Sequence, residues 1–275
     1  MSFDFYKMHG AGNDFIVIDN RDRLYRQWPP EFVREICNAR TGIGADGLLM
    51  IEKTPNAEFR MRFYNSDGFE SEMCVNGSRC ICYLAYHLKL VGKAFTFLAG
   101  DGLHAAEIIS RHRVKIQVLM HTATDNRTFP VDFELPDSLY FKRFLNTGVP
   151  HVVIGSSDIW KVPVEGLGNA LRFHEYYQPE GTNVNFVQVV SNTEPFKLKM
   201  RTFERGVDRE TLSCGTGATA AALSFFSNNK NEHCNVKVET RGGELNVSFT
   251  GNGNDIYLEG PVKIVYTGTF FEEDN

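Results

Sequence analysis

The sequence lacks the features that mark several classes of protein. No apolar run approaches the roughly 20 residues needed to cross a bilayer, so we predict neither a membrane span nor a membrane partner. The net charge is −5 and basic residues form no stripe, since the cluster at residues 111–113 is short and interrupted, which argues against a nucleic-acid surface. Residues 1–4 are acidic and polar, unlike a secretory signal, and we therefore expect a cytoplasmic protein.

The spacing of the six cysteines does not suggest a structural metal site. They lack the paired C-x-x-C spacing of structural zinc sites, and the sequence shows neither a pyridoxal-phosphate lysine motif nor a cluster of metal ligands. We therefore predict that the protein uses no cofactor and no metal. Cys37, Cys80, Cys82 and Cys234 are interpreted as small apolar packing residues.

What the sequence does contain is one short cassette that occurs twice. Cys74 opens the run Cys-Val-Asn-Gly-Ser, and Cys214 opens the run Cys-Gly-Thr-Gly-Ala. Matching residues stand at similar distances from each cysteine: Phe63 and Phe203, Asn65 and Arg205, Gly10 and Gly148, Asn13 and His151, Gly100 and Gly242, and Leu103 and Leu245. Two copies at this spacing indicate an internal duplication rather than a solenoid, which needs a shorter period and at least three repeats.

The duplication predicts the domain organisation. Residues 1–120 should form an N-terminal lobe that carries Cys74, residues 121–143 a connecting segment, and residues 144–275 a C-terminal lobe that carries Cys214. A chain of 275 residues is long enough for two domains, each with its own core.

Local patterns predict the elements of each lobe. Residues 81–88 and 218–226 follow the two cassettes and lack a broad charged face, so each helix should be enclosed by protein. Apolar runs at 59–64, 185–190 and 196–200 predict strands, and residues 30–38, led by proline, predict another helix. The predicted fold class is α/β (α+β), with two pseudo-symmetric lobes, each a mainly antiparallel or mixed β-sheet rolled around a central helix.

The cassette cysteines are placed for acid/base chemistry. Cys74 and Cys214 each precede a helix start, where unpaired N–H groups and the positive end of the helix dipole favour a thiolate. Two such thiols, facing each other across a cleft between the lobes, would serve both faces of one carbon. One thiolate would remove a proton while the opposite thiol supplied another, which inverts the stereocentre.

A set of motifs, in order along the chain, carries a resemblance to a known family. They are KMHGAGNDF at 7–15, GIGADG at 42–47, YNSDG at 64–68, MCVNGSRC at 73–80, NTGVPH at 146–151, TNVNF at 182–186, ERGV at 204–207 and CGTG at 214–217. Together they resemble diaminopimelate epimerase over essentially the whole chain. The resemblance implies a cofactor-independent isomerase that interconverts LL- and meso-diaminopimelate in lysine and peptidoglycan biosynthesis, and it implies a homodimer.

The resemblance also implies roles for individual residues. Cys74 and Cys214 match the acid/base pair, and the turns at Val75, Asn76, Gly215 and Thr216 match the backbone amides that hold the carboxylate on the reacting carbon. Asn13 and His151 match polar residues next to the thiols. The distal amino-acid end of the substrate would be held by residues that match Asn65, Asn183, Glu204 and Arg205.

Three positions depart from the family pattern. Val75 stands where glycine is usual, Val149 where many members have asparagine, and Gly47 where some have glutamine. Valine adopts glycine's left-handed conformations only at a cost and adds bulk near the reacting carbon. We therefore expect substrate selectivity to be relaxed, with slow racemisation of glutamate as a side activity.

Three other interpretations stay open at this point. A proline or hydroxyproline racemase would share two cysteines, but the run at 9–14 and the pair Glu204 and Arg205 argue against it. The phenazine-biosynthesis isomerases would share the fold without the cysteine pair. A binding protein without catalysis would keep the binding site, and solvent deuterium exchange into an amino acid would distinguish it from an enzyme.

Overall fold

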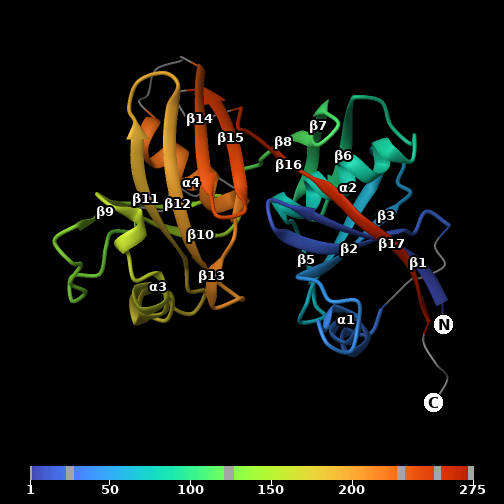
Figure 1. The fold of residues 1–275 in the computed structure, drawn as a ribbon, viewed down its shortest axis with the longest axis horizontal. Helices are drawn as coiled ribbons and strands as arrows, with labels where there is room; N and C mark the ends of the chain where they lie inside the picture. Colours follow the sequence, from blue (N-terminus) through green and yellow to red (C-terminus); the bar gives the residue numbers. More distant parts are fainter. Residues whose placement is uncertain (1, 23–27, 121–126, 228–232, 251–254, 272–275) are drawn as a thin grey trace. The chain divides into compact units, whose positions relative to one another are not determined.

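The chain folds into two compact units (Figure 1). The computed structural model describes residues 2–22, 28–120, 127–227, 233–250 and 255–271. The first unit comprises Met1–Gln117 and Gly260–Asn275, and the second comprises Val118–Glu259. Each unit is described by itself.

The first unit consists of ten consecutive elements and one strand from the end of the chain. They are β1 (Ser2–Gly10), β2 (Asn13–Asp19), α1 (Pro30–Cys37), β3 (Gly47–Glu52), β4 (Arg60–Asn65), β5 (Glu70–Ser71), α2 (Val75–His87), β6 (Ala94–Ala99), β7 (Gly102–Ser110), β8 (Arg113–Gln117) and β17 (Lys263–Phe271). Strand β1 pairs antiparallel with β17 and with β2, and β2 runs parallel to β3. Strand β4 pairs antiparallel with β3 and β5 and parallel with β6, and β6, β7 and β8 continue as an antiparallel meander.

The second unit is built from the same kinds of element. They are β9 (Leu139–Asn146), β10 (Pro150–Ser156), η1 (Ile159–Lys161), α3 (Val164–Arg172), η2 (Glu175–Tyr177), β11 (Asn183–Ser191), β12 (Phe196–Glu204), β13 (Arg209–Thr211), α4 (Gly215–Phe226), β14 (His233–Thr240), β15 (Gly243–Thr250) and β16 (Tyr257–Pro261), whose last residues enter the first unit. Strand β10 pairs antiparallel with β9 and parallel with β11. Strand β12 pairs antiparallel with β11 and β13 and parallel with β14, and β14, β15 and β16 form an antiparallel meander.

The pairing order of β9 to β16 thus repeats that of β1 to β8, strand by strand. Each cassette stands at the same place in this order, between a short strand and the central helix. The matched residues Asn13 and His151 lie on the equivalent strands β2 and β10. The topology therefore agrees with the duplication inferred from the sequence.

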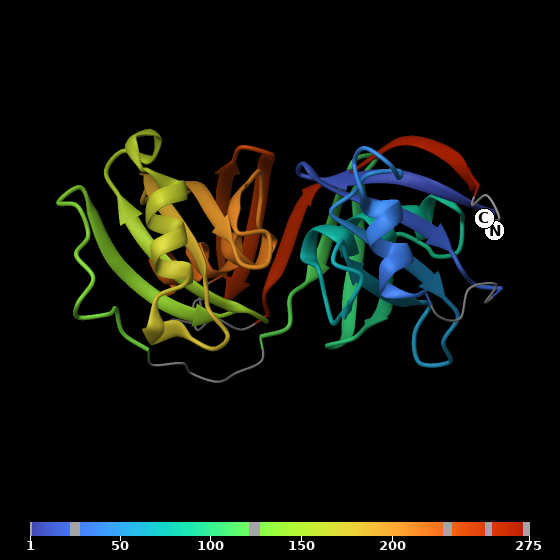
Figure 2. The ribbon, with the colours of Figure 1, turned by 90° about the horizontal axis from the view of Figure 1, so that it is seen from below.

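Helices α2 and α4 are the central helices of their units. Helix α2 packs against β1, β2, β3, β4, β7 and β8, and α4 packs against β9, β10, β11, β12, β14 and β15 (Figure 2). Nearly every residue of α4 up to Ser224 is buried, and so are the first eight residues of α2. Because strands surround each helix, neither needs a charged face, and the prediction of enclosed helices is confirmed.

Helices α1 and α3 lie outside the strands of their units (Figures 1 and 2). Helix α1 buries Val33 and Ile36 against β3, as the sequence predicts for residues 30–38. Ile16 and Ile18 of β2 share a core cluster with Val33 and Ile36 of α1, and α2 also packs against β2, which explains why its run of four apolar residues does not alternate. Helix α3 was not predicted, although Val164, Leu167 and Leu171 have the spacing of one helix face.

The fold class and the predicted strands are confirmed, since β4, β11 and β12 cover the three apolar runs. The compact units divide the chain differently from the lobes expected at 1–120 and 144–275. Strand β17 pairs with β1 over nearly its whole length, so the C-terminal residues join the first unit. Of the segment expected to connect the lobes, residues 121–126 lie outside the described residues, and β9 begins at Leu139.

Candidate active site

Cys74 is the N-cap residue of α2. Its backbone is extended (φ −135°, ψ 114°), and its Sγ accepts a hydrogen bond from the Gly77 N–H at 3.4 Å. The side chain is partly exposed, whereas Val75 and Asn76 behind it are buried. The thiol therefore lies at the positive end of a helix dipole, with a backbone N–H already directed at the sulfur.

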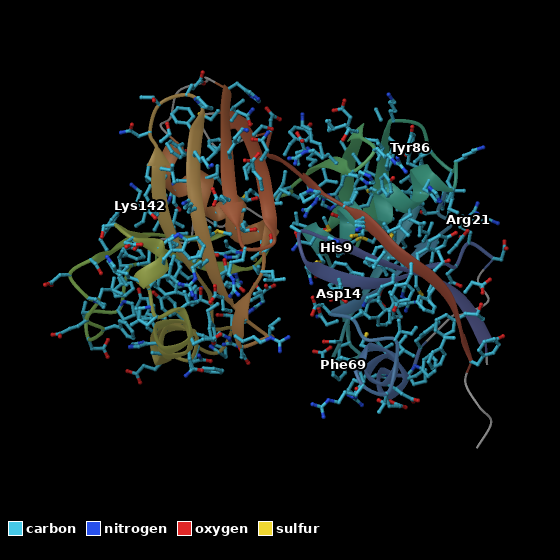
Figure 3. All side chains as sticks on the ribbon, in the orientation of Figure 1. His9, Asp14, Arg21, Phe69, Tyr86 and Lys142 are labelled. Carbon is cyan, nitrogen blue, oxygen red and sulfur yellow. The ribbon has the colours of Figure 1, made fainter. Side chains whose placement is uncertain are left out.

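A network of side-chain amides surrounds this thiol. The Cys74 thiol donates to Asn13 Oδ1 at 3.8 Å, and Asn76 Nδ2 donates to the same oxygen at 3.2 Å. Asn13 Nδ2 donates in turn to Asp46 Oδ2 at 2.7 Å. A carboxylate can only accept, so Asp46 fixes the Asn13 amide with its oxygen towards the cysteine. The Asp46 carboxylate also accepts from the backbone N–H of Asp14, which is labelled in Figure 3 and pairs with Lys7.

A buried arginine supports this network from behind. Arg79 donates to Asn76 Oδ1 at 2.8 Å and to the Val75 carbonyl at 3.2 Å. The guanidinium is fully buried, and burial lowers the pKa of Arg79 to about 10, which leaves it a cation at neutral pH. A Cβ on Gly10 would lie 3.2 Å from Arg79 Nη2 and 2.8 Å from the Asn76 carbonyl oxygen. The end of β1 can therefore approach α2 this closely only with glycine at residue 10.

Cys214 has the same relation to α4. It is the N-cap residue with φ −123° and ψ 114°, and its Sγ accepts from the Gly217 N–H at 3.4 Å. The sulfur also lies 3.4 Å from the Thr216 hydroxyl oxygen, in a contact where either group can donate. Thr147 Oγ1 donates to the Thr216 carbonyl at 3.0 Å and holds this first turn. Both cassette cysteines therefore meet a helix N-terminus with nearly identical geometry.

His151 lies at the start of β10 and is fully buried. Its Nδ1 lies 3.0 Å from Asn185 Nδ2, and among the described residues its Nε2 has no hydrogen-bond partner. Burial, and secondly the charge of Arg205, lowers the pKa of His151 to about 3. The imidazole is therefore neutral at physiological pH.

The residues expected to hold the distal end of the substrate lie in two places. Asn183 is buried, donates to the Pro150 carbonyl at 2.9 Å and accepts from the Arg205 N–H at 2.9 Å. The Arg205 guanidinium donates to the Glu180 carbonyl at 3.0 Å, and burial together with the charge of Arg172 lowers its pKa. Glu204 accepts from the Thr211 hydroxyl at 2.9 Å.

The remaining distal residue belongs to the first unit. Asn65 ends β4 and is exposed, where its backbone bonds with Phe69. The structure thus brings Asn13, Cys74 and Asn76 together in the first unit, and Asn183, Glu204 and Arg205 together in the second. Asn65 stands where Arg205 stands in the repeat, at the end of an equivalent strand.

The departures from the family pattern have structural counterparts. Val75 is the first residue of α2 and is not among the described residues with positive φ, so it needs no left-handed conformation there. A Cβ on Gly47 would lie 2.6 Å from the Tyr64 carbonyl and 2.8 Å from the Phe63 ring, so a larger residue would not fit without a backbone shift. Val149 is half-buried beside Pro150.

Four residues of the site were missed by the sequence analysis: Asp46, Arg79, Asn185 and Thr202. The first three lie inside the quoted motifs, but their roles depend on partners far along the chain. A polar residue within a continuous apolar run, as at Asn185, was the available signal, because a buried polar group requires a partner.

The sequence profile of the family described as diaminopimelate epimerase matches residues 5–124 and 143–265. The diaminopimelate epimerase of Aquifex aeolicus is 43% identical over 281 residues, which cover 98% of each chain. This chain belongs to the diaminopimelate epimerase family. The resemblance is therefore confirmed, and with it the prediction of an amino-acid epimerase for diaminopimelate.

Solved structures with similar folds are more distant in sequence from this epimerase. A phenazine biosynthesis protein of the PhzF family from Bacillus anthracis has a TM-score of 0.72 at 13% identity and covers 99% of this chain and 100% of its own. A hydroxyproline epimerase from Agrobacterium vitis, with bound trans-4-hydroxy-L-proline, has a TM-score of 0.64 at 13% identity and covers 98% and 91%. At this identity the likeness shows a shared fold, whereas the family match decides between the alternatives.

The other cysteines of this family member lie in its cores. Cys37, Cys80, Cys82 and Cys234 are buried and form no disulfide, and burial raises the pKa of Cys37 to about 12 and that of Cys80 and Cys82 well above the usual value. Their interpretation as packing residues agrees with this burial. In the described ranges, no three His, Cys, Asp or Glu side chains are grouped to hold a metal ion. Nor does any described helix combine the length and apolar character needed to cross a membrane.

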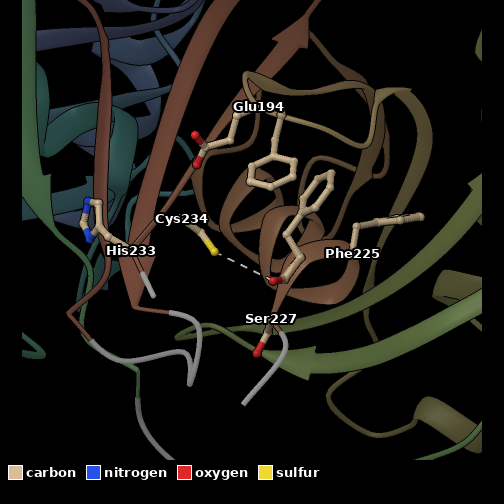
Figure 4. A pocket seen from close by; sticks show the side chains of 7 residues that line it. Glu194, Phe225, Ser227, His233 and Cys234 are labelled. Carbon is tan, nitrogen blue, oxygen red and sulfur yellow. Dashed lines mark hydrogen bonds between the residues drawn. The ribbon is translucent and has the colours of Figure 1, made fainter. Parts of the chain in front are cut away.

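A cavity of about 390 Å³ lies at the C-terminal end of α4 (Figure 4). Its lining includes Phe196, Phe226 and His233, and Cys234 approaches the Phe226 carbonyl there at 3.9 Å. Cys214 is at the opposite end of the same helix. None of the predicted site residues lines this cavity, so it is separate from the candidate active site of the epimerase.

Proposed function

We propose that this protein interconverts LL- and meso-diaminopimelate with Cys74 and Cys214 as the acid/base pair. The observation that carries the proposal is the repeated cap geometry, in which each cysteine sulfur accepts a glycine N–H at 3.4 Å at the start of a central helix. The reaction would serve lysine and peptidoglycan biosynthesis in the cytoplasm. The resemblance further supports a homodimer, which sedimentation at several protein concentrations would test.

The reaction requires both thiols to reach one α-carbon from opposite faces. The thiolate on one face removes the α-proton, and the thiol on the other face donates its proton to the resulting carbanion. The carbon is inverted, and the two cysteines exchange protonation states. No bond other than C–H and S–H forms or breaks, so the reaction needs no redox partner.

The carbanion must be stabilised without an electron sink. The backbone N–H groups of Val75, Asn76, Gly215 and Thr216 belong to the first turns of α2 and α4, where the helix dipole favours an anion. A substrate carboxylate bound there would become an enolate-like dianion as the proton leaves. Fixed N–H groups directed at that oxygen would lower the barrier, since they stabilise charge that develops in the transition state.

Asn13 and His151 would orient the groups around the reacting carbon. Asn13 presents its oxygen to the Cys74 thiol, which suits the protonated, proton-donating form of that cysteine. His151 is neutral, and a neutral imidazole can donate a hydrogen bond to a carboxylate without giving up its proton.

The distal end of diaminopimelate carries a second carboxylate and ammonium. Arg205 can bind that carboxylate through two parallel hydrogen bonds, Glu204 can accept from the ammonium, and Asn65 can do either. The Asn183 amide bonds to the Pro150 carbonyl and to the Arg205 N–H, so it can position Arg205 and still offer its second N–H to the substrate.

Proton exchange in D2O tests the proposal. Chelator-treated, dialysed protein should exchange the α-proton of LL-diaminopimelate for deuterium and produce the meso isomer, as followed by NMR and chiral chromatography. Exchange that depends on added pyridoxal phosphate or metal would contradict the mechanism, and binding without exchange would indicate a binding protein.

The same assay with L-glutamate tests the side activity. We expect slow racemisation of glutamate by the native protein, because apolar contacts near the reacting carbon discriminate less than hydrogen bonds do. Val75→Gly should lower the ratio of glutamate to diaminopimelate turnover. An unchanged ratio would show that Val75 has a structural role alone.

A further inference from the structure

His151 is contacted by a buried polar group that the mechanism above does not use. Asn185 lies on β11, is fully buried, and directs its side chain towards His151 on the neighbouring strand β10. Its Nδ2 lies 3.0 Å from His151 Nδ1 and 3.2 Å from the Val152 carbonyl oxygen. Its Oδ1 accepts from the Thr202 hydroxyl, on β12, at 3.0 Å.

These contacts determine which way the amide points. The Val152 carbonyl oxygen can only accept, so it must face the NH2 group of Asn185 and not its oxygen. In this orientation the amide oxygen faces the Thr202 hydroxyl on the other side, which donates to it. The second N–H of Asn185 is then directed at His151 Nδ1.

The amide orientation in turn determines the tautomer of the imidazole. An Nδ1 atom that accepts a hydrogen bond cannot carry a proton, and a neutral ring must then carry its proton on Nε2. That Nε2 atom is buried and has no hydrogen-bond partner among the described residues. A buried donor without a partner costs free energy, which a ligand that accepts its hydrogen bond would recover.

The approach of Asn185 to α4 links this histidine to the Cys214 cassette. A Cβ on Gly217 would lie 2.3 Å from Asn185 Oδ1, so the amide can occupy its place only because residue 217 is glycine. The corresponding glycine of the first unit, Gly77, faces the methyl groups of Leu49 instead. The first unit has Asn13 in place of His151, and an asparagine has no tautomer to control.

We propose that Asn185, held by Thr202, is a positioning residue that fixes His151 as the neutral Nε2–H tautomer, so that the ring serves as a hydrogen-bond donor to an anionic oxygen of the substrate. The consequence for catalysis rests on the proposed epimerase function, whereas the tautomer itself does not. In this arrangement His151 is not a general base at its Nε2 atom. Its N–H would instead strengthen its hydrogen bond as negative charge grows on the substrate carboxylate.

Nitrogen-15 NMR of the full-length protein tests the tautomer directly, without substrate. Two-bond couplings from the ring carbon-bound protons distinguish Nδ1–H, Nε2–H and the imidazolium, and a His151→Gln variant assigns the signal among the eight histidines. The native protein should show His151 as Nε2–H from about pH 5 to pH 8, the range in which unperturbed histidine titrates. An Nδ1–H or imidazolium signal would overturn the proposal.

Matched variants separate positioning from general packing. Thr202→Val removes the hydroxyl at constant shape and should produce a mixture of tautomers, whereas Thr202→Ser keeps the hydroxyl and should restore the native spectrum. Asn185→Asp places an acceptor at Nδ1 and should move the proton there. A native spectrum for both Thr202→Val and Asn185→Asp would show that neither residue determines the tautomer.

Kinetics provide the second measurement. Thr202→Val should lower kcat by roughly 10- to 100-fold, the loss typical where a partner that orients a histidine is removed in metal sites, with little change in KM and with rescue by Thr202→Ser. If the spectra behave as expected but the protein does not epimerise diaminopimelate, the proposed function fails and the tautomer assignment stands. If the protein epimerises diaminopimelate but His151 carries its proton on Nδ1, the proposed function stands and the tautomer assignment fails.

Discussion

Replacement of each cassette cysteine by serine separates its role as a helix N-cap from its role as a catalytic acid or base. Cys74 and Cys214 both accept a hydrogen bond from a glycine N–H at the start of a helix. Serine is a good N-cap residue and keeps that acceptor, so the free energy of unfolding should change by less than about 1 kcal/mol. Alanine removes the acceptor and should cost about 1 kcal/mol or more at either position.

Catalysis should respond very differently. A hydroxyl is a far weaker base than a thiolate, and a positioned general acid or base contributes roughly 10²- to 10⁴-fold to a rate. That range equals about 3–5 kcal/mol of barrier, several times the expected change in stability. Each serine variant should therefore remain folded and lose inversion by at least that factor.

Deuterium exchange identifies which face each thiol serves. In Cys74→Ser, the remaining Cys214 thiolate should exchange the α-proton of one stereoisomer with solvent and return deuterium to the same face. Cys214→Ser should exchange only the other stereoisomer. NMR of the α-position in D2O, beside urea unfolding of the same samples, measures both properties. Near-normal epimerisation by a folded single variant would refute the two-thiol reasoning.

Three further predictions follow from other parts of the structure. Arg205→Ala should raise KM for diaminopimelate while leaving α-proton exchange of a shorter amino acid nearly unchanged, and unaltered diaminopimelate kinetics would exclude Arg205 from distal recognition. In α3, Gly168→Ala should destabilise the protein by about 1–3 kcal/mol in urea unfolding because a Cβ there would lie 2.4 Å from Phe203, whereas the exposed Gly166→Ala has nothing within 4 Å and should stabilise it by up to about 1 kcal/mol. Burial alone would raise the pKa of Glu210, but its hydrogen bonds and ion pair with Arg201, with help from Arg241, hold that pKa below its usual value. The contribution of the ionised Glu210 to stability is then present at neutral pH and is lost as pH falls from about 5 through the native pKa. Glu210→Gln should therefore destabilise the protein less at pH 4 than at pH 7. An equal effect at both pH values would contradict this assignment.

Much of the architecture was determined by local sequence pattern. The repeated cassette, the matched residues around it and the apolar runs of the strands are readable because side-chain periodicity reflects which faces are buried. Helix α1 was predicted at residues 30–38 from its leading proline and one apolar face, and the structure has it at Pro30–Cys37. The enclosure of α2 and α4 followed from their lack of a charged face.

Other features depended on pairings between distant residues, which no local pattern encodes. Strand β17 joins the first unit through its pairing with β1, which connects residues as far apart in the sequence as Ser2 and Phe271. The short helix α3 carries two glycines, which weaken its local signal, yet Gly168 lets it pack closely on Phe203.

The same distinction holds for the candidate site. The sequence by itself determined the two cysteines, since each helix start is a local feature that the chain repeats. Only the tertiary structure decided that Asp46 orients Asn13 and that Asn185 orients His151, because these contacts join residues 33 and 34 positions apart. Buried polar groups need partners, and strand register, a property of the whole sheet, determines which partner each one meets.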